Sequence, residues 1–334
     1  MTSTDLETAQ REIDDLRAAF DRLRAAIGTR VLGQSEVCEE LLICLFADGH
    51  ALLEGAPGLG KTTLVRALAD SLALRYRRVQ FTPDLMPPDI LGTRILELED
   101  PKRRQFRFEP GPVFTHVLLA DEINRATPRT QSALLEAMQE RQVTIFGETR
   151  KLEDPFLVIA TQNPIEMEGT YPLPEAQLDR FLLKIELEMP EEEELAAILK
   201  STTGEPPAAL QPVLTRDDVC RMRALVRSVP ASSEMVELAS HVVLATHPGT
   251  EYAPERVKSF VRYGSSPRGG QAILLAAKAR ALIRGRLFVH EEDFEALAAP
   301  ALRHRLILGY EGEASGVRPD ELVADALEAA RRRR

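Results

Sequence analysis

Tryptophan is absent from this chain of 334 residues, and tyrosine occurs only five times. The 42 lysines and arginines are outnumbered by 52 aspartates and glutamates, which gives a net charge of −10. Proteins that bind nucleic acid along an extended surface use a basic face with aromatic platforms on which bases stack. The composition therefore argues against broad nucleic-acid binding, although a local basic loop is compatible with it.

Cysteine is scarce, and no apolar run is long enough to cross a membrane. Cys38, Cys44 and Cys220 have neither zinc-ligand spacing nor a reactive context, and the six histidines form no metal pattern. These cysteines are typical of buried thiols in a reducing cytosol. The first ten residues are polar and acidic, unlike a signal peptide. We expect a cytoplasmic protein with no direct membrane insertion.

The strongest positive signal is the segment 55–62, Gly-Ala-Pro-Gly-Leu-Gly-Lys-Thr, which fits the phosphate-binding loop GxxxxGK[ST]. It follows a short apolar strand at 51–53 and precedes a predicted helix at 63–74. Glycines let backbone N–H groups face phosphate oxygens at the start of that helix. Lys61 is expected to reach the β- and γ-phosphates, and Thr62 to bind magnesium. A glycine-rich turn that binds nothing would fit the same short pattern.

A second signal is the apolar run 117–120, which ends in Asp121 and Glu122. Acidic residues at the carboxyl end of a buried parallel strand lie where ligands bind in open α/β sheets. Asp121 is expected to hold magnesium, and Glu122 to act as the general base toward water. A solvated acidic turn is the ordinary alternative, but the phosphate-binding loop makes it less attractive.

A third apolar strand, 156–162, ends at Asn163. An amide there can orient water near the γ-phosphate without adding charge. Because Asn-Pro is also a favoured turn dipeptide, Asn163 taken alone indicates only a turn. Beside the other two signals, we favour the catalytic role.

The pattern along the chain predicts strands alternating with helices up to about residue 190, and therefore a mostly parallel sheet. The segments 94–108 and 143–152 alternate like hairpins, and a linker is predicted at 201–213. Beyond it everything is expected to be helical. Three units follow: an N-terminal helix at 1–28, an α/β core at 29–190 and a helical domain at 191–334.

The sequence resembles the MoxR-type AAA+ ATPases, in the clade with an insertion in its second helix. The resemblance spans roughly residues 10–310 and is carried by the segments 81–85 (FTPDL), 120–128 (ADEINRATP), 131–138 (QSALLEAM), 160–164 (ATQNP) and 168–181 (EGTYPLPEAQLDRF). It implies an α/β AAA+ core, with a mostly parallel five-stranded sheet flanked by helices, and then a smaller all-helical lid domain. The segment 94–108 would be the helix-2 insert and 143–152 the hairpin before sensor 1, both facing a central pore.

The resemblance also implies roles for individual residues. Asn163 corresponds to sensor 1, Arg180 to an arginine finger supplied to a neighbouring subunit, and Arg268 to sensor 2. Arg125 is a further candidate sensor between subunits. ATP would contact Gly55, Ala56, Pro57, Gly58, Leu59, Gly60, Lys61, Thr62, Thr63, Val31, Gly33, Gln34 and Arg268, with Val31–Gln34 lying against adenine. Thr62 and Asp121 would hold Mg²⁺, and Lys61, Glu122, Asn163 and Arg180 would be catalytic.

Each arginine has an ordinary alternative. Arg180 could pair with Asp179 on the surface, an interaction worth less than about 1 kcal/mol. Arg268 stands near the start of a helix, where the helix dipole disfavours a cation unless a phosphate intervenes. In the mechanism we expect, Arg268 joins Lys61 and Asp121 of its own subunit in neutralising the phosphates.

The function that the resemblance implies is ATP hydrolysis by a homo-oligomeric ring, expected to be a hexamer. Such a ring would act as a chaperone-like remodeller that matures or assembles partner proteins, among them proteins with a von Willebrand factor A domain. Three alternatives stay open: an ATPase subunit of a magnesium-chelatase-like complex, a nucleic-acid motor, and a nucleotide-gated switch with negligible turnover.

Overall fold

The computed structural model describes residues 3–100, 103–164, 169–204 and 209–333. Its centre is a five-stranded parallel sheet in the order β2-β5-β8-β1-β9. The strands are β1 (Ala51–Gly55), β2 (Tyr76–Gln80), β5 (Val117–Asp121), β8 (Leu157–Gln162) and β9 (Leu183–Leu187). The prediction of a mostly parallel five-stranded sheet is confirmed.

Helices cover both faces of this sheet because its strands carry apolar side chains on both sides. Leu53, Leu119 and Ile159 pack into one buried cluster with α1 (Ser3–Gly28), α2 (Ser35–Phe46) and α3 (Lys61–Ser71). The alternate residues Leu52, Leu118 and Val158 pack into a second cluster with α5 (Pro128–Glu140). The consecutive apolar residues of each strand therefore point alternately into two hydrophobic clusters, one on each face of the sheet.

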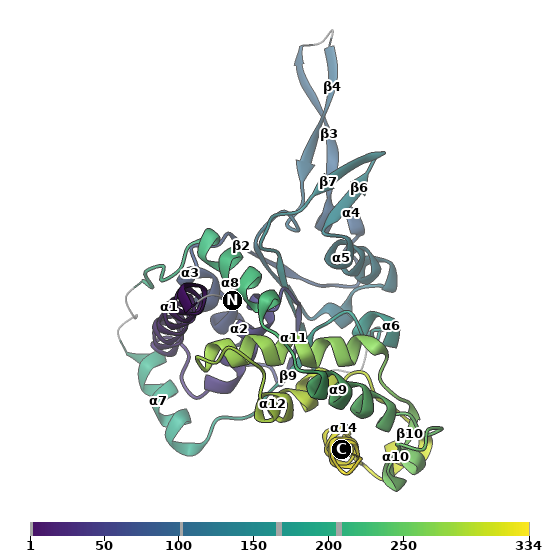
Figure 1. Ribbon diagram of the computed structural model, residues 1–334. Coiled ribbons are helices and arrows are strands. Elements are labelled where there is room, and N and C mark those ends of the chain that lie inside the picture. Colours follow the sequence, from purple (N-terminus) through teal and green to yellow (C-terminus); the bar gives the residue numbers. More distant parts are fainter. Residues whose placement is uncertain (1–2, 101–102, 165–168, 205–208, 334) are drawn as a thin grey trace.

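Two hairpins project from the α/β core at one end of the molecule (Figure 1). The longer one consists of β3 (Gly92–Asp100) and β4 (Arg103–Pro110), and follows the short helix α4 (Pro87–Leu91). The shorter one consists of β6 (Gln142–Ile145) and β7 (Glu148–Lys151). Both hairpins were predicted, and the insert is longer than the predicted 94–108.

The C-terminal part is helical apart from the short antiparallel pair β10 (Val261–Tyr263) and β11 (Ile307–Leu308). Its helices are α8 (Arg216–Ser228), α9 (Ser233–Ala245), α10 (Glu255–Phe260), α11 (Pro267–Ile283), α12 (Glu291–Leu302), α13 (Tyr310–Ala314) and α14 (Pro319–Arg331). Thr215 caps α8 by accepting a bond from the Asp218 N–H at 3.2 Å, as the capping-box pattern predicts.

The predicted linker at 201–213 begins too early, although its residues 209–213 form neither helix nor strand. Helix α7 (Glu192–Thr203) occupies the start of the segment predicted as a linker, whose residues 205–208 lie outside the described residues. At the other end of this domain, Arg331 belongs to α14, and its Nε lies 2.7 Å from a Glu291 carboxylate oxygen. Ion pairing across helices is not visible in the sequence of a single segment.

Candidate active site

The phosphate-binding loop joins the carboxyl end of β1 to the start of α3. Gly58 and Gly60 have φ values of +86° and +80°, which L side chains rarely adopt. The loop is largely exposed from Pro57 to Gly60, and Lys61 is the first residue of α3. The turn therefore depends on glycine at two positions, of which Gly60 is fixed by the motif and Gly58 is a variable position of it.

Lys61 lies at the carboxyl edge of the sheet. Its ammonium donates to the Gly55 carbonyl at 2.7 Å and to the Gln162 carbonyl, at the end of β8, at 3.4 Å. Burial lowers the pKa of Lys61, against the opposing effect of the carboxylates of Asp121, Glu122 and Glu54. The two carbonyls direct the side chain across the edge at which the strands end.

Asp121 is 8% exposed and is fixed from two sides. Its Oδ1 accepts from the Thr161 hydroxyl at 2.6 Å. Its Oδ2 accepts from Arg78 Nε at 3.1 Å and from Nη2 at 2.5 Å. The carboxylate therefore stands at the end of β5 with both oxygens oriented by neighbouring strands.

Glu122, the next residue, has a left-handed backbone conformation, with φ 55° and ψ 51°. Such a conformation is unusual for a residue other than glycine and is found at functional sites. Its N–H donates to Thr161 Oγ1 at 2.8 Å, and its carboxylate accepts from Gln80 at 2.7 Å and Arg125 at 3.0 Å. This backbone conformation directs the Glu122 side chain away from that of Asp121, and the two carboxylates have different side-chain partners.

Asn163 is 5% exposed and follows β8, between the strands that carry Asp121 and the phosphate-binding loop. The structure therefore brings Lys61, Asp121, Glu122 and Asn163 together at one edge of the sheet. Thr62 and Thr63 lie in the first turn of α3 beside them.

Of the segment predicted to lie against adenine, Gly33 and Gln34 line a recess of about 490 Å³, whereas Val31 is not part of its wall. Gln34 Nε2 donates to the Glu188 carbonyl at 3.4 Å, and Gly55 lies against Leu187 at the end of β9. Residues of the helical domain, Arg303, Arg318 and Asp320, complete the wall. The recess thus lies beside the end of β9, the strand against which Gly55 packs.

Arg180 and Arg268 lie elsewhere. They line a separate recess of about 260 Å³ together with Asp48, Gly49 and His50. Those three residues precede β1, and Arg180 precedes β9, so this recess lies at the amino edge of the parallel sheet. Lys61 lies at the carboxyl edge. The expected grouping of Arg268 with Lys61 and Asp121 of the same chain is therefore wrong.

The surface pair predicted as the alternative for Arg180 is not the arrangement found either. Asp179 pairs with Arg305, with Nε to Oδ1 at 2.8 Å, and lies 3.6 Å from Arg268 Nη1. Within the described ranges the structure gives no ion pair to Arg180, whose side chain is half-buried in the recess.

Comparisons with known proteins agree with this geometry. Residues 50–183 match the ATPase family associated with various cellular activities, and residues 253–326 match an AAA lid domain. Chaperone MoxR1 of Mycobacterium tuberculosis is 44% identical to this protein, and the match covers 89% of this chain and 78% of the MoxR1 chain. Protein MoxR of Paracoccus denitrificans is 35% identical to this protein, and the match covers 95% of this chain and 96% of the MoxR chain.

A crystal structure of a Cytophaga hutchinsonii protein superposes with a TM-score of 0.90 at 39% identity, covering 98% of each chain. The chain belongs to the MoxR family of AAA+ ATPases. As a member of this family it binds nucleotide and hydrolyses ATP.

Three side chains of this MoxR-family site were not predicted from the sequence. Thr161 bonds both Asp121 and Glu122, Arg78 pairs with Asp121, and Gln80 bonds Glu122. Arg78 is the middle residue and Gln80 the last residue of β2, which the register places beside β5. The sequence shows them only as polar residues in or beside predicted strands. They can be assigned to the site only when the order of the strands in the sheet is known.

Proposed function

We propose that this protein binds Mg²⁺-ATP at the carboxyl edge of its sheet and that an adjacent copy completes the site with Arg180 and Arg268. The observation that supports this is the placement of the two arginines at the opposite edge from Lys61 and Glu122. One chain cannot bring both sets to one triphosphate. A ring of copies, which we infer to be a hexamer, brings one edge against the other.

The donor atoms at the carboxyl edge suit magnesium, which prefers oxygen ligands. Thr62 and Asp121 would hold the ion, which when bound would neutralise charge on the phosphates. Asp121 Oδ1 is oriented by Thr161, whereas Oδ2 faces the Arg78 guanidinium. Since a guanidinium and a metal cation repel each other, we expect Arg78 to move aside when the ion binds.

The remaining roles follow from the chemistry of each side chain. Lys61 neutralises the β- and γ-phosphates. Glu122 removes a proton from the attacking water, and Asn163 orients that water. Arg180 and Arg268 of the adjacent copy stabilise the charge on the transferred phosphoryl group, a contribution worth roughly 10³–10⁵ in rate for an arginine finger.

A mixing experiment tests the shared site. Glu122→Gln subunits cannot activate water but still offer Arg180, whereas Arg180→Ala subunits keep Glu122 but offer no finger. Each variant alone should be nearly inactive, and mixing them should restore ATP hydrolysis. The absence of any restoration in mixtures shown to co-assemble would refute catalysis between subunits.

For the ring as a whole we propose a chaperone-like role, in which nucleotide turnover remodels partner protein complexes. The support is the name of the MoxR1 relative and the pair of hairpins that projects beyond the ATPase core. The exposed side chains of Phe106 and Phe146 offer apolar contacts on these hairpins. We infer client proteins that include von Willebrand factor A domains.

Affinity capture with Glu122→Gln, which should retain ATP and freeze client complexes, tests this role. Recovery of a von Willebrand factor A protein supports remodelling. Recovery of the partner subunits of a metal-insertion complex would favour a magnesium-chelatase-like role, and recovery of nucleic acid would favour a motor.

A further inference from the structure

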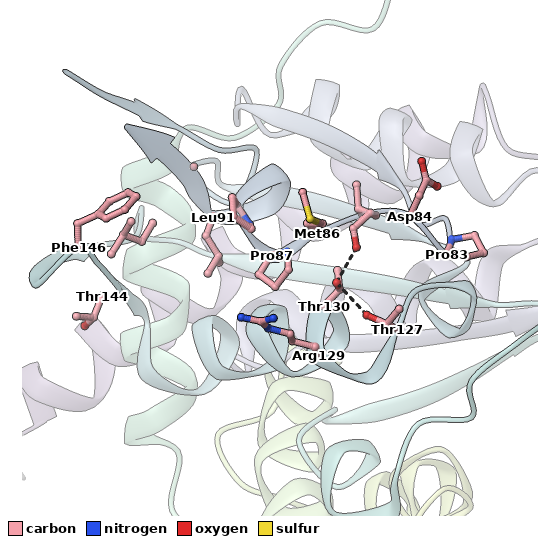
Figure 2. Close-up of a pocket in the computed structure, with 14 residues that line it drawn as sticks. Pro83, Asp84, Met86, Pro87, Leu91, Thr127, Arg129, Thr130, Thr144 and Phe146 are labelled. Carbon is pink, nitrogen blue, oxygen red and sulfur yellow. Dashed lines mark hydrogen bonds between the residues drawn. The ribbon is translucent and has the colours of Figure 1, made fainter. Parts of the chain in front are cut away.

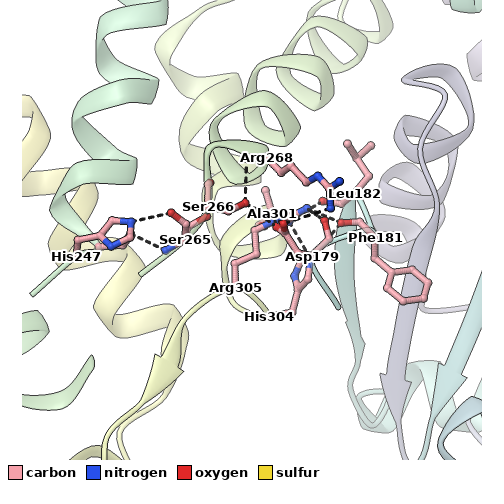
Figure 3. A network of polar contacts seen from close by, with 11 residues as sticks. Asp179, Phe181, Leu182, His247, Ser265, Ser266, Arg268, Ala301, His304 and Arg305 are labelled. Atoms are coloured by element: carbon pink, nitrogen blue, oxygen red, sulfur yellow. Dashed lines mark hydrogen bonds and ion pairs between the residues drawn. The ribbon is translucent and has the colours of Figure 1, made fainter. Parts of the chain in front are cut away.

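A single carboxylate, that of Asp179, lies between the segment that carries Arg180 and the helix that carries Arg268. Its two oxygens accept from the Ser266 hydroxyl at 3.0 and 2.9 Å, and Oδ1 also accepts from Arg305 Nε at 2.8 Å. Figure 3 shows these groups converging from α11, from the chain after α12 and from the segment before β9.

Arg305 fixes the segment that carries the finger. Its guanidinium donates to the backbone carbonyls of Asp179 at 3.0 Å, Phe181 at 2.6 Å and Leu182 at 3.3 Å, on both sides of Arg180. The Arg305 residue is only 7% exposed. Burial lowers its pKa, and the Asp179 carboxylate opposes that effect. Asp179 thus supplies the negative charge that keeps a buried cation in place behind Arg180.

Ser266 fixes the other arginine. Its hydroxyl accepts from the Arg268 backbone N–H at 3.1 Å and so forms the N-cap of α11. The same hydroxyl donates to Asp179. The helix that presents Arg268 therefore begins on a side chain held by the residue next to Arg180.

We infer that Asp179 is a positioning residue that fixes Arg180 and Arg268 relative to each other, so that both reach one triphosphate on the adjacent copy. The inference rests on the proposed function, because it concerns the arginines supplied to a neighbour. It assigns to the helical domain of each copy a direct part in the site of the next one.

The test uses the mixed rings described above, with Glu122→Gln subunits as finger donors and Arg180→Ala subunits as acceptors. Asp179→Asn on the donor should lower the restored kcat by about tenfold or more, since small misplacements of a catalytic group have effects of this size. The KM for ATP should change less than about threefold, because the acceptor keeps its own nucleotide contacts.

The same Asp179→Asn change on the acceptor should add no further loss, because that subunit already lacks its finger. If Asp179 only stabilised the fold, the change would lower ATP hydrolysis equally on the donor and on the acceptor. The matched control is Asp325→Asn on the donor, which removes a different ion pair of the helical domain, with Arg256 at 3.0 Å. This control should restore activity as fully as the unaltered donor.

Two outcomes separate the proposals. No restoration in the unaltered mixture refutes the shared site itself. Full restoration with equal effects of Asp179→Asn on donor and acceptor refutes the positioning role alone. If Asp179→Asn does not fold, Ser266→Ala on the donor replaces it, with Ser266→Thr as the rescue because threonine keeps the hydroxyl. Equal activity of these two serine variants would then refute the positioning role.

Discussion

Thr161 joins the two acidic residues of the site through one hydroxyl group. It donates to Asp121 at 2.6 Å and accepts from the Glu122 N–H at 2.8 Å, and the residue is fully buried. The sequence assigned no role to this position, although it lies in the segment 160–164. Its importance follows from the neighbouring positions of β5 and β8 in the sheet.

Thr161→Val should therefore lower both stability and activity. The change leaves a buried N–H without its acceptor, which costs about 1–3 kcal/mol of unfolding free energy. It also frees the Asp121 carboxylate to turn, so kcat should fall. Urea unfolding and steady-state ATP hydrolysis measure the two effects. Thr161→Ser keeps the hydroxyl and is the control, and equal losses in both variants would contradict this role.

Glu40, on α2 beneath the predicted adenine recess, makes stability depend on pH. Burial raises its pKa from the ordinary 4.5 to about 7; Arg303 opposes this effect, and Glu36, Glu39 and Glu186 add to it. Below pH 4.5 the carboxyl is protonated in both the folded and the unfolded state. Between that pH and about 7 the folded state binds more protons, so the contribution of Glu40 to stability falls as the pH rises.

Glu40→Gln should accordingly be more stable than the unaltered protein at pH 8, and the difference should shrink toward pH 5. Urea midpoints across this range measure the difference. Glu237→Gln on the exposed surface of α9 is the control for losing a carboxylate. A difference that is constant with pH would contradict the assignment to Glu40.

At the scale of elements, the turn end of the shorter hairpin packs against the base of the longer one. Arg94 of β3 lies 3.0 Å from the Glu148 carboxylate and 4.9 Å from the centre of the Phe146 ring, and Arg150 of β7 lies 4.2 Å from the centre of the Phe108 ring. A recess of about 550 Å³ lies beside this junction, with Met86, Pro87 and Phe146 in its wall (Figure 2). The hairpins are therefore expected to move as one unit.

Arg94→Ala should loosen the shorter hairpin with little effect on overall stability. A partly exposed ion pair and a cation–π contact are worth up to about 1 kcal/mol each. Amide hydrogen exchange over residues 142–151 should be about fivefold faster, because the free energy of local opening falls by about 1 kcal/mol. Arg107→Ala, whose partner Glu109 lies on its own strand, is the control. Unchanged exchange in Arg94→Ala would show that the hairpins are independent.

At the scale of the whole molecule, one apolar cluster runs through both the α/β core and the helical domain. It includes residues of β1 and β9 together with residues of α8, α11 and α14. Helix α1 contacts α3 on the core and α11 on the helical domain, and its Phe20 is 2% exposed. The N-terminal helix predicted as a separate unit at 1–28 thus packs against both larger parts.

We expect a single cooperative unfolding transition in calorimetry of the dilute protein. Phe20→Ala should lower its midpoint without splitting it, since truncating a buried phenylalanine costs about 3–5 kcal/mol. Arg24→Ala on the exposed face of α1 is the control. Two resolved transitions in the unaltered protein would contradict the shared core.

No described helix is long and apolar enough to cross a membrane. In the same described part of the chain, no cluster of three or more histidine, cysteine, aspartate or glutamate side chains is placed to hold a metal ion. Cys38 and Cys44 are buried, as expected, whereas Cys220 is partly exposed.

The parallel sheet, and the positions of the motif residues at one edge of it, could be predicted from the sequence. The phosphate-binding loop, Asp121, Glu122 and Asn163 each directly follow an apolar strand, and the carboxyl ends of parallel strands share one edge. The edge on which Arg180 and Arg268 lie, and the side chains that orient Asp121 and Glu122, could be seen only in the folded chain. Those outcomes depend on strand order and on how the helical domain packs, and both arise from contacts between residues far apart in the chain.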